Sequence, residues 1–170
     1  MRILVVCQYY KPEPFRISDI CEALVAQGHS VTVVTGTPNY PEGEIYAGYE
    51  GQVHRDETIN GVRVHRCPIH PRKKGALHRF WNYYSFVLAS NRYLRSLKED
   101  FDVVLVNQLS PVMMAEGALR WAKRHRKKTV LYCLDLWPES LSAGGIRPGS
   151  LIYRIFWHIS RRIYRGADMI

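Results

Sequence analysis

Short, uncharged runs of residues recur along the chain with the spacing of an α/β fold. Residues 3–7 and 31–35 carry no charge and are rich in β-branched side chains, which is typical of strands buried on both faces of a parallel sheet. Between them, Ser18 and Asp19 predict the start of a helix and Gly28 predicts its end. This order is a βαβ unit, whose functional loops gather where the strands end.

The same pattern continues through the second half of the chain. Residues 103–107 and 130–133 predict two more buried strands. Apolar residues at helical spacing predict helices over residues 77–98 and 151–165. Residues 110–111 are Ser-Pro, which we interpret as an N-cap followed by proline at the first position of another helix.

Two loops and one hairpin separate these elements. Residues 36–51 are rich in Pro, Gly, Asn and Tyr and predict a long functional loop. Residues 52–58 and 62–66 alternate around an Asn-Gly pair, which is a strong signal for a hairpin of two strands. Residues 135–149 predict a second loop.

The elements together predict one α/β domain. Residues 167–170 look like the opening of another strand, so we interpret the chain as a truncated piece of a longer protein. Residues 1–170 are expected to form a Rossmann-like, three-layer α/β/α domain around a mostly parallel sheet. Because open α/β sheets bind ligands at the carboxyl ends of their strands, we expect the functional site there.

The charge balance predicts an anionic partner. Lys and Arg total 24 against 15 Asp and Glu, giving a formal net charge of +9. A nucleotide, a diphosphate or an acidic membrane surface would fit this charge. Nucleic acid would fit too, but the sequence lacks the aromatic and glycine-rich motifs of RNA-binding modules, and we expect no nucleic-acid partner.

Cysteine and histidine spacing bears on localisation and on cofactors. The four cysteines are widely spaced, which favours reduced thiols in a cytoplasmic protein. We find no apolar stretch long enough for a membrane span and no signal peptide, although the domain could lie on a membrane surface. The histidines show no metal-ligand spacing, so we expect no metal and no cofactor.

The first loop offers cations instead of a nucleotide-binding motif. It lacks GxGxxG, and the chain lacks GxxxxGK[ST], so neither NAD binding nor simple NTP hydrolysis is supported. Lys11 and Arg16 lie close to the predicted start of the first helix, where a diphosphate would meet cationic side chains and free backbone N–H groups. The alternative is a solvated loop with scattered charge.

Residues 135–140 combine two carboxylates with an indole directly after a buried strand. This composition suits sugar recognition, because Trp137 could stack on a sugar face while Asp135 or Glu139 accepts hydrogen bonds from hydroxyls. In the alternative interpretation, Asp135 and Ser140 are loop caps and Trp137 is part of the core.

Two basic segments also have two interpretations. Residues 123–128 are a run of basic side chains at a helix end, where positive charge complements the helix dipole and needs no ligand. Residues 151–165 are aromatic and basic enough for a helix lying in a membrane interface. Packing of that helix on the sheet explains the same apolar stripe.

Four segments, taken in order, carry a family resemblance. Residues 1–14, 24–35, 38–46 and 135–140 resemble GT4 glycosyltransferases, in particular the subgroup of fucosamine transferases of O-antigen assembly and related capsular and colanic acid enzymes. The resemblance implies a retaining, metal-independent enzyme of two GT-B domains. Its N-terminal half would hold the acceptor, a polyprenyl-diphosphate-linked saccharide at the inner membrane face. The nucleotide-sugar would be bound mostly by a C-terminal domain, so this piece alone is expected to be inactive.

The resemblance also implies roles for particular residues. Many GT4 members carry a Gly-Gly pair in the first loop, where backbone N–H groups contact the donor phosphates. This chain has residues 14–17 there, and Arg16 would take over the contact with the donor phosphates. Asp135 is the leading catalytic candidate. The expected acceptor-binding residues are Asn39, Tyr40, Trp137 and Glu139. The alternatives are another GT-B enzyme, such as a nucleotide-sugar 2-epimerase or a glycogen-type phosphorylase, and a non-catalytic basic binding module or peripheral membrane protein.

Overall fold

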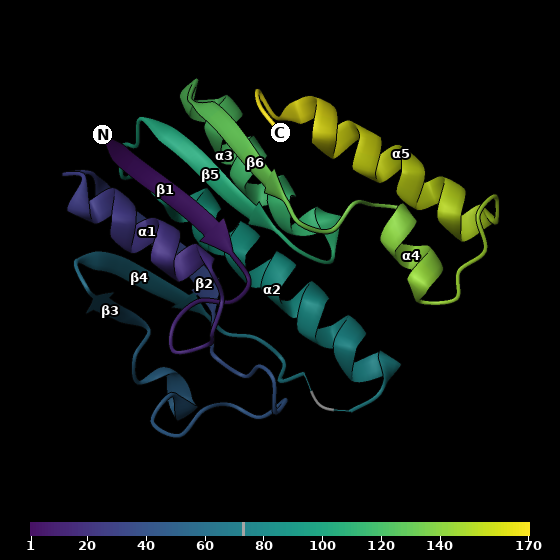
Figure 1. Ribbon diagram of the computed structural model, residues 1–170, viewed down its shortest axis with the longest axis horizontal. Coiled ribbons are helices and arrows are strands. Elements are labelled where there is room, and N and C mark those ends of the chain that lie inside the picture. Colours follow the sequence, from purple (N-terminus) through teal and green to yellow (C-terminus); the bar gives the residue numbers. More distant parts are fainter. Residues whose placement is uncertain (73) are drawn as a thin grey trace.

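A computed structural model describes residues 1–72 and 74–170 of the protein. Its centre is a six-stranded sheet in the order β3-β4-β2-β1-β5-β6 (Figure 1). All neighbouring strands are parallel except β3, which pairs antiparallel with β4. The strands are β1 (Arg2–Cys7), β2 (Ser30–Gly36), β3 (Asp56–Ile59), β4 (Val62–Cys67), β5 (Val103–Gln108) and β6 (Lys128–Cys133).

Helices cover both faces of this sheet. Buried side chains of α1 pack on one face, and those of α2, α3 and α5 pack on the other. The expected three-layer, Rossmann-like α/β architecture is therefore confirmed. The helices are α1 (Ile17–Ala26), α2 (Ala76–Ser96), α3 (Glu116–His125), α4 (Glu139–Ala143) and α5 (Leu151–Gly166), with 3₁₀ turns η1 (Glu50–Gln52) and η2 (Val112–Ala115).

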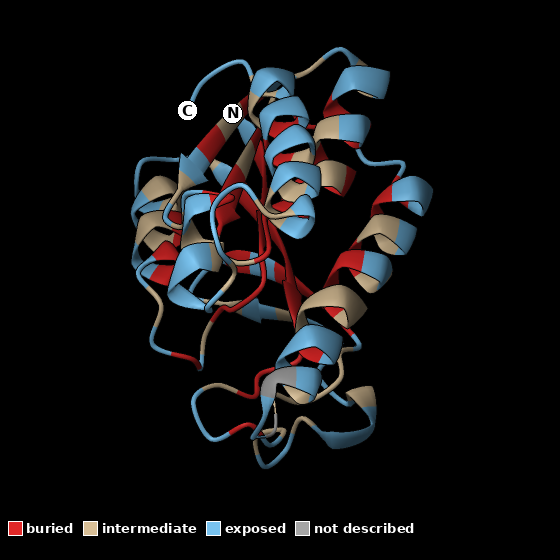
Figure 2. Ribbon diagram, turned by 90° about the vertical axis from the view of Figure 1, so that its right-hand side faces the viewer, coloured by how far each residue is buried: buried red, intermediate tan, exposed pale blue. Residues whose placement is uncertain are grey.

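The central strand β1 explains why the apolar runs are unbroken. Alternate side chains of a strand point to opposite faces, and the side chains on both faces of β1 are buried. Figure 2 shows the buried residues, in red, gathered in the strands at the centre of the molecule. Leu4 and Val6 join the core under α2 and α3, while Ile3, Val5 and Cys7 join the core under α1. Each buried Val or Leu side chain stabilises the fold by about 1.5–3 kcal/mol.

The strand order places the topological switch point of the sheet between β1 and β5. The chain moves from β1 to β2 and β4 on one side and returns to β5 and β6 on the other, which makes this point the topological switch where α/β sheets bind ligands. On each side of this point, a backbone hydrogen bond connects the ends of neighbouring strands. The Gln8 carbonyl accepts from the Gly36 N–H at 3.1 Å, and the Gln108 carbonyl accepts from the Leu134 N–H at 3.0 Å.

One predicted strand boundary is wrong. The strand expected over residues 52–58 begins only at Asp56, because Gly51 and Gln52 adopt left-handed φ values of 62° and 64° that interrupt extended backbone. The hairpin is nevertheless confirmed. Asn60 and Gly61 have φ values of 49° and 81°, as a two-residue type I′ turn requires.

Ser110 is not the N-cap that we expected. The turn η2 begins after Pro111 and α3 begins only at Glu116, while the Ser110 hydroxyl donates to the carboxylate of Asp135 at 2.7 Å. The predicted loop over residues 135–149 also contains the short helix α4.

The end of the chain pairs with the sheet as the pattern predicts. Met169 forms a parallel bridge with Val130, and its carbonyl accepts from the Leu131 N–H at 2.8 Å. Across the described ranges, no helix is both long and apolar enough to cross a membrane.

Candidate functional site

Two groups of polar side chains lie at the carboxyl edge of the sheet. The Glu13 cluster consists of Glu13, Asn39, Tyr40 and Asn82, from the loops after β1 and β2 and from α2. The Asp135 cluster consists of Gln108, Ser110, Asp135 and Trp137, from the segments after β5 and β6. The strands β1 and β5 are adjacent, so the two clusters flank the topological switch point.

Glu13 ties the first loop to the second. Its carboxylate is buried, with 1 % of the residue exposed. Oε1 accepts from the backbone N–H groups of Asn39 and Tyr40, both at 2.8 Å, and Oε2 accepts from the Tyr10 N–H at 3.3 Å. A carboxylate with three backbone donors sets the conformation of the loop that follows β2.

Burial raises the pKa of Glu13 to about 7, because desolvation of the charged form outweighs the three hydrogen bonds and the nearby Arg66 guanidinium, which favour it. The protonation of this carboxyl group therefore changes near neutral pH. Deprotonation gives the backbone donors of Asn39 and Tyr40 a stronger acceptor.

Asn39 is fully enclosed in a hydrogen-bond network. Its Oδ1 accepts from the Arg72 backbone N–H at 3.0 Å and from Asn82 Nδ2 at 3.2 Å. Its own Nδ2 donates to the Thr37 carbonyl at 3.0 Å. The side chain is 0 % exposed, so Asn39 shapes the loop from inside.

Tyr40 belongs to an aromatic group that is partly exposed. Its ring centroid lies 5.5 Å from that of Tyr9 and 5.2 Å from that of Phe15. The Arg72 guanidinium lies over the Tyr40 ring, 5.5 Å from its centroid. An aromatic surface with an adjacent cation suits a ligand that combines a sugar with a phosphate.

The Asp135 cluster connects the ends of β5 and β6. Ser110 Oγ donates to Asp135 Oδ2 at 2.7 Å, and Gln108 Nε2 donates to the Asp135 carbonyl at 2.8 Å. Asp135 is half-buried. Within the described part of the chain, Ser110 is the side chain that donates to this carboxylate, so Oδ1 remains open to a hydroxyl of a ligand.

The Trp137 ring is buried, with 8 % of the residue exposed. It packs edge-on against Phe156, with ring centroids 5.2 Å apart, and its Nε1 donates to Ser110 Oγ at 3.1 Å. The alternative interpretation of Trp137 as a core residue is confirmed. Through Ser110, this indole supports the position of Asp135.

Two buried amide oxygens mark the switch point itself. Gln8 and Gln108 are both fully buried, and in the described residues the Oε1 atom of each lacks a hydrogen-bond partner. Buried polar atoms are normally satisfied. These two oxygens lie at the carboxyl ends of β1 and β5, the strands on either side of the switch point.

The remaining predicted residues lie apart from these clusters. Lys11 Nζ is paired with Glu22 of α1. Arg16 is exposed at the residue before α1, and Glu139 is exposed at the start of α4. The structure thus places Asn39 close to Tyr40, and Asp135 close to Trp137. Lys11 is already held in an ion pair.

Sequence reasoning missed Glu13, Asn82 and Arg72. Glu13 lies between two prolines in the loop that follows a buried strand, and this signal could have identified it. Asn82 lies in the middle of a helical segment, where the sequence carries no sign of its contact with Asn39. The described residues contain no group of three His, Cys, Asp or Glu side chains placed to hold a metal ion.

A comparison with protein families decides the assignment. Residues 15–170 match the Glycosyl transferase 4-like domain. The chain belongs to this glycosyltransferase family. It is also 28 % identical over 151 residues to a protein of Escherichia coli (strain K12) named as a colanic acid biosynthesis glycosyl transferase, WcaI. This match covers 86 % of the chain but 37 % of WcaI, so the chain spans little more than a third of its relative.

Solved structures are only distantly similar. The C-terminal domain of a Pyrococcus furiosus hydrogenase is 17 % identical, with a TM-score of 0.47 over 76 % of this chain and 89 % of that domain. Acinetobacter baumannii MurG is 13 % identical, with a TM-score of 0.41 over 84 % of this chain and 38 % of MurG. Both scores are low, and the family assignment of this glycosyl transferase 4-like domain rests on the sequence match.

Proposed function

We propose that this domain is the acceptor-side half of a GT-B glycosyltransferase. The complete enzyme would transfer a sugar, with retention of configuration, from a UDP-sugar to a polyprenyl-diphosphate-linked saccharide. The reaction would serve capsule, O-antigen or exopolysaccharide biosynthesis, at the cytoplasmic face of the inner membrane and without a metal or other cofactor. The observation that carries the proposal is the family match over residues 15–170, and the relative named for colanic acid biosynthesis supports its pathway class.

The two clusters support separate roles in binding the acceptor and in the transfer step. The partly exposed rings of Phe15 and Tyr40, which pack against the buried Tyr9, would contact the acceptor saccharide, and Arg72 beside Tyr40 would face the diphosphate. Asp135, with Oδ1 open and Oδ2 held by Ser110, would accept from a sugar hydroxyl at the reacting end.

A transfer assay on the longer protein tests this function. UDP-sugars would be screened against a polyprenyl-diphosphate-linked saccharide, with transfer expected for one donor. Asp135→Asn is expected to lower kcat about 100-fold or more, because it removes a charge used in the reaction, while the melting temperature stays close to that of the wild type. Glu99→Gln is the matched control, since it removes an exposed carboxylate that pairs with Arg63 at 2.7 Å near the amino end of the sheet. A folded two-domain protein that transfers no sugar from any donor would contradict the proposal.

A further inference from the structure

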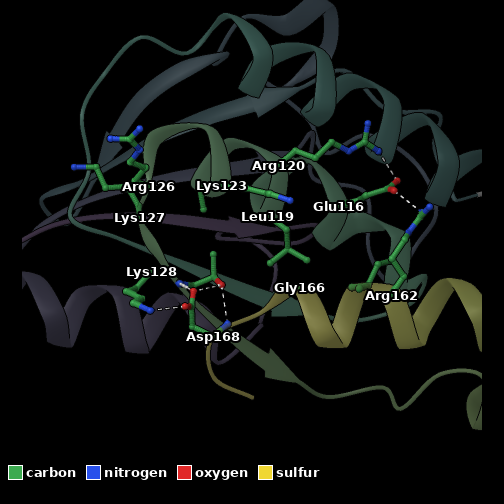
Figure 3. A pocket seen from close by; sticks show the side chains of 13 residues that line it. Glu116, Leu119, Arg120, Lys123, Arg126, Lys127, Lys128, Arg162, Gly166 and Asp168 are labelled. Carbon is green, nitrogen blue, oxygen red and sulfur yellow. Dashed lines mark hydrogen bonds and ion pairs between the residues drawn. The ribbon is translucent and has the colours of Figure 1, made fainter.

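A large groove, shown in Figure 3, lies at the amino edge of the sheet, opposite the edge that carries the candidate site. Its volume is about 870 Å³. It is bordered by the end of α3, the first residues of β6 and the end of α5. The strand β6 runs from this edge toward the Asp135 cluster, so the groove is separate from the proposed transfer site.

The groove carries an excess of positive charge. Its lining includes two carboxylates, those of Glu116 and Asp168. The cations that line it are Arg120, Lys123, Arg126, Lys127, Lys128 and Arg162. The lining therefore has four more positive than negative side chains.

Both carboxylates are already engaged by the protein. Glu116 pairs with Arg120 and with Arg162, each at 2.6 Å. Asp168 accepts from Lys128 Nζ at 2.7 Å and from the Thr129 N–H at 2.9 Å, and the hydrogen bond from Lys128 helps to lower the pKa of Asp168 to about 2. Neither carboxylate is therefore placed to neutralise the rest of the groove.

Lys123 and Arg126 are the cations left without a carboxylate. In Figure 3 no dashed line reaches either side chain, and neither forms an ion pair among the described residues. Lys127 is paired outside the groove, with Asp100 at 2.7 Å. Two exposed cations next to a further ion-paired set form a site with spare positive charge.

The helix dipole explains only part of this arrangement. Cations at the carboxyl end of α3 complement its dipole, but Lys128 comes from β6 and Arg162 from α5. Arg126 also occupies the left-handed position after α3, with φ of 55° and ψ of 41°, where glycine is preferred. Cations from three elements therefore line one cavity. One of them, Arg126, occupies a backbone position at which glycine would make the fold more stable.

We propose that this basic groove, defined by Arg120, Lys123, Arg126, Lys128 and Arg162, binds a phosphate-bearing anion. Arginine and lysine together match a multiply charged phosphate, through forked hydrogen bonds from the guanidinium groups and a point charge from the ammonium group. The cavity is large enough for a diphosphate with a group attached. The source of the phosphate is either a soluble compound or the headgroup of an anionic phospholipid.

The test uses the full chain and two probes. Inorganic pyrophosphate is titrated by calorimetry, and vesicles of phosphatidylglycerol are compared with vesicles of phosphatidylcholine by co-sedimentation. The double variant Lys123→Glu with Arg126→Glu is expected to lower affinity about tenfold or more, because two charge-assisted contacts become repulsive. The control, Arg55→Glu with Arg92→Glu, makes the same change in net charge at two exposed residues outside the groove. Thermal melts confirm that both double variants fold.

Each outcome has one meaning. Pyrophosphate binding that is lost in the groove variant and kept in the control supports the site with a soluble ligand. Binding to phosphatidylglycerol vesicles alone, with the same dependence on the variant, supports the site with a lipid headgroup. Absence of both interactions, or equal losses in the groove variant and the control, overturns the proposal. Binding that survives in the groove variant but is lost on Arg16→Glu also overturns it, because the phosphate then binds the first loop.

Discussion

The buried carboxyl group of Glu13 makes a specific prediction about stability and pH. Glu13→Gln keeps the size of the side chain but replaces one acceptor oxygen by an NH₂ group. In the wild type, both carboxylate oxygens accept from backbone N–H groups of Tyr10, Asn39 and Tyr40. The variant must therefore lose at least one of these hydrogen bonds, and it also loses the titration of this carboxyl group.

The direction of the pH effect follows from the raised pKa. Burial, opposed by the hydrogen bonds and by Arg66, raises the pKa of Glu13 from 4.5 to about 7 in the folded protein. The folded state then holds the proton more tightly than the unfolded chain, so the stabilisation from protonation is full below about pH 4.5 and is lost as pH rises through about 7. Between pH 5.5 and pH 8 the loss amounts to about 2 kcal/mol.

Urea unfolding at a series of pH values measures this effect. The quantity of interest is the unfolding free energy of the wild type minus that of Glu13→Gln, because titrations elsewhere in the chain cancel in the difference. This difference is expected to fall by about 2 kcal/mol from pH 5.5 to pH 8. Glu44→Gln, which removes an exposed carboxylate from the loop after β2 that Glu13 contacts, is the matched control. A difference that stays constant, or that rises with pH, would refute the assignment of Glu13 as a buried group with a raised pKa.

Three further substitutions test the packing and the turns. Gly61→Ala is expected to destabilise the protein by about 1–2 kcal/mol, because φ is 81° and the new methyl group would lie 2.9 Å from Val25; an unchanged urea midpoint would count against the type I′ turn. Arg126→Gly should stabilise by about 1 kcal/mol at this left-handed position and yet weaken pyrophosphate binding, and calorimetry on the same sample checks both. Trp137→Ala should cost about 3–5 kcal/mol, as expected for a large buried ring, and a thermal melt like that of the wild type would show that the indole is not a core residue.

The elements that could be predicted from sequence are those whose signals are local. An unbroken apolar run indicates that both faces of a strand are buried. The bounds predicted in this way for β1 and β5 agree closely with those in the structure. The Asn60-Gly61 pair reports its own backbone conformation. Ser110 failed as a cap because its hydroxyl instead donates to Asp135, a partner 25 residues further along the chain.

The candidate site depended more heavily on contacts between distant segments. Lys11 looks like a free cation in the first loop, but folding places Glu22 beside it. The role of Glu13 depends on backbone donors 26 and 27 residues away, and such donors have no signature in the local sequence. Trp137 had two interpretations until its burial was known. Asp135 was indicated by the composition of residues 135–140 and by the family resemblance, and Tyr40 by the resemblance. The structure adds the neighbours through which they would act.

Binding of the acceptor by this chain tests the central claim most directly. A short-chain polyprenyl-diphosphate-linked saccharide and a UDP-sugar would each be titrated into the protein by calorimetry. We predict that the acceptor binds with the higher affinity, that Arg72→Glu weakens this binding about tenfold, and that the double variant Lys123→Glu with Arg126→Glu leaves it unchanged. Tight binding of the UDP-sugar with no binding of the acceptor would contradict the assignment of this domain as the acceptor-side half.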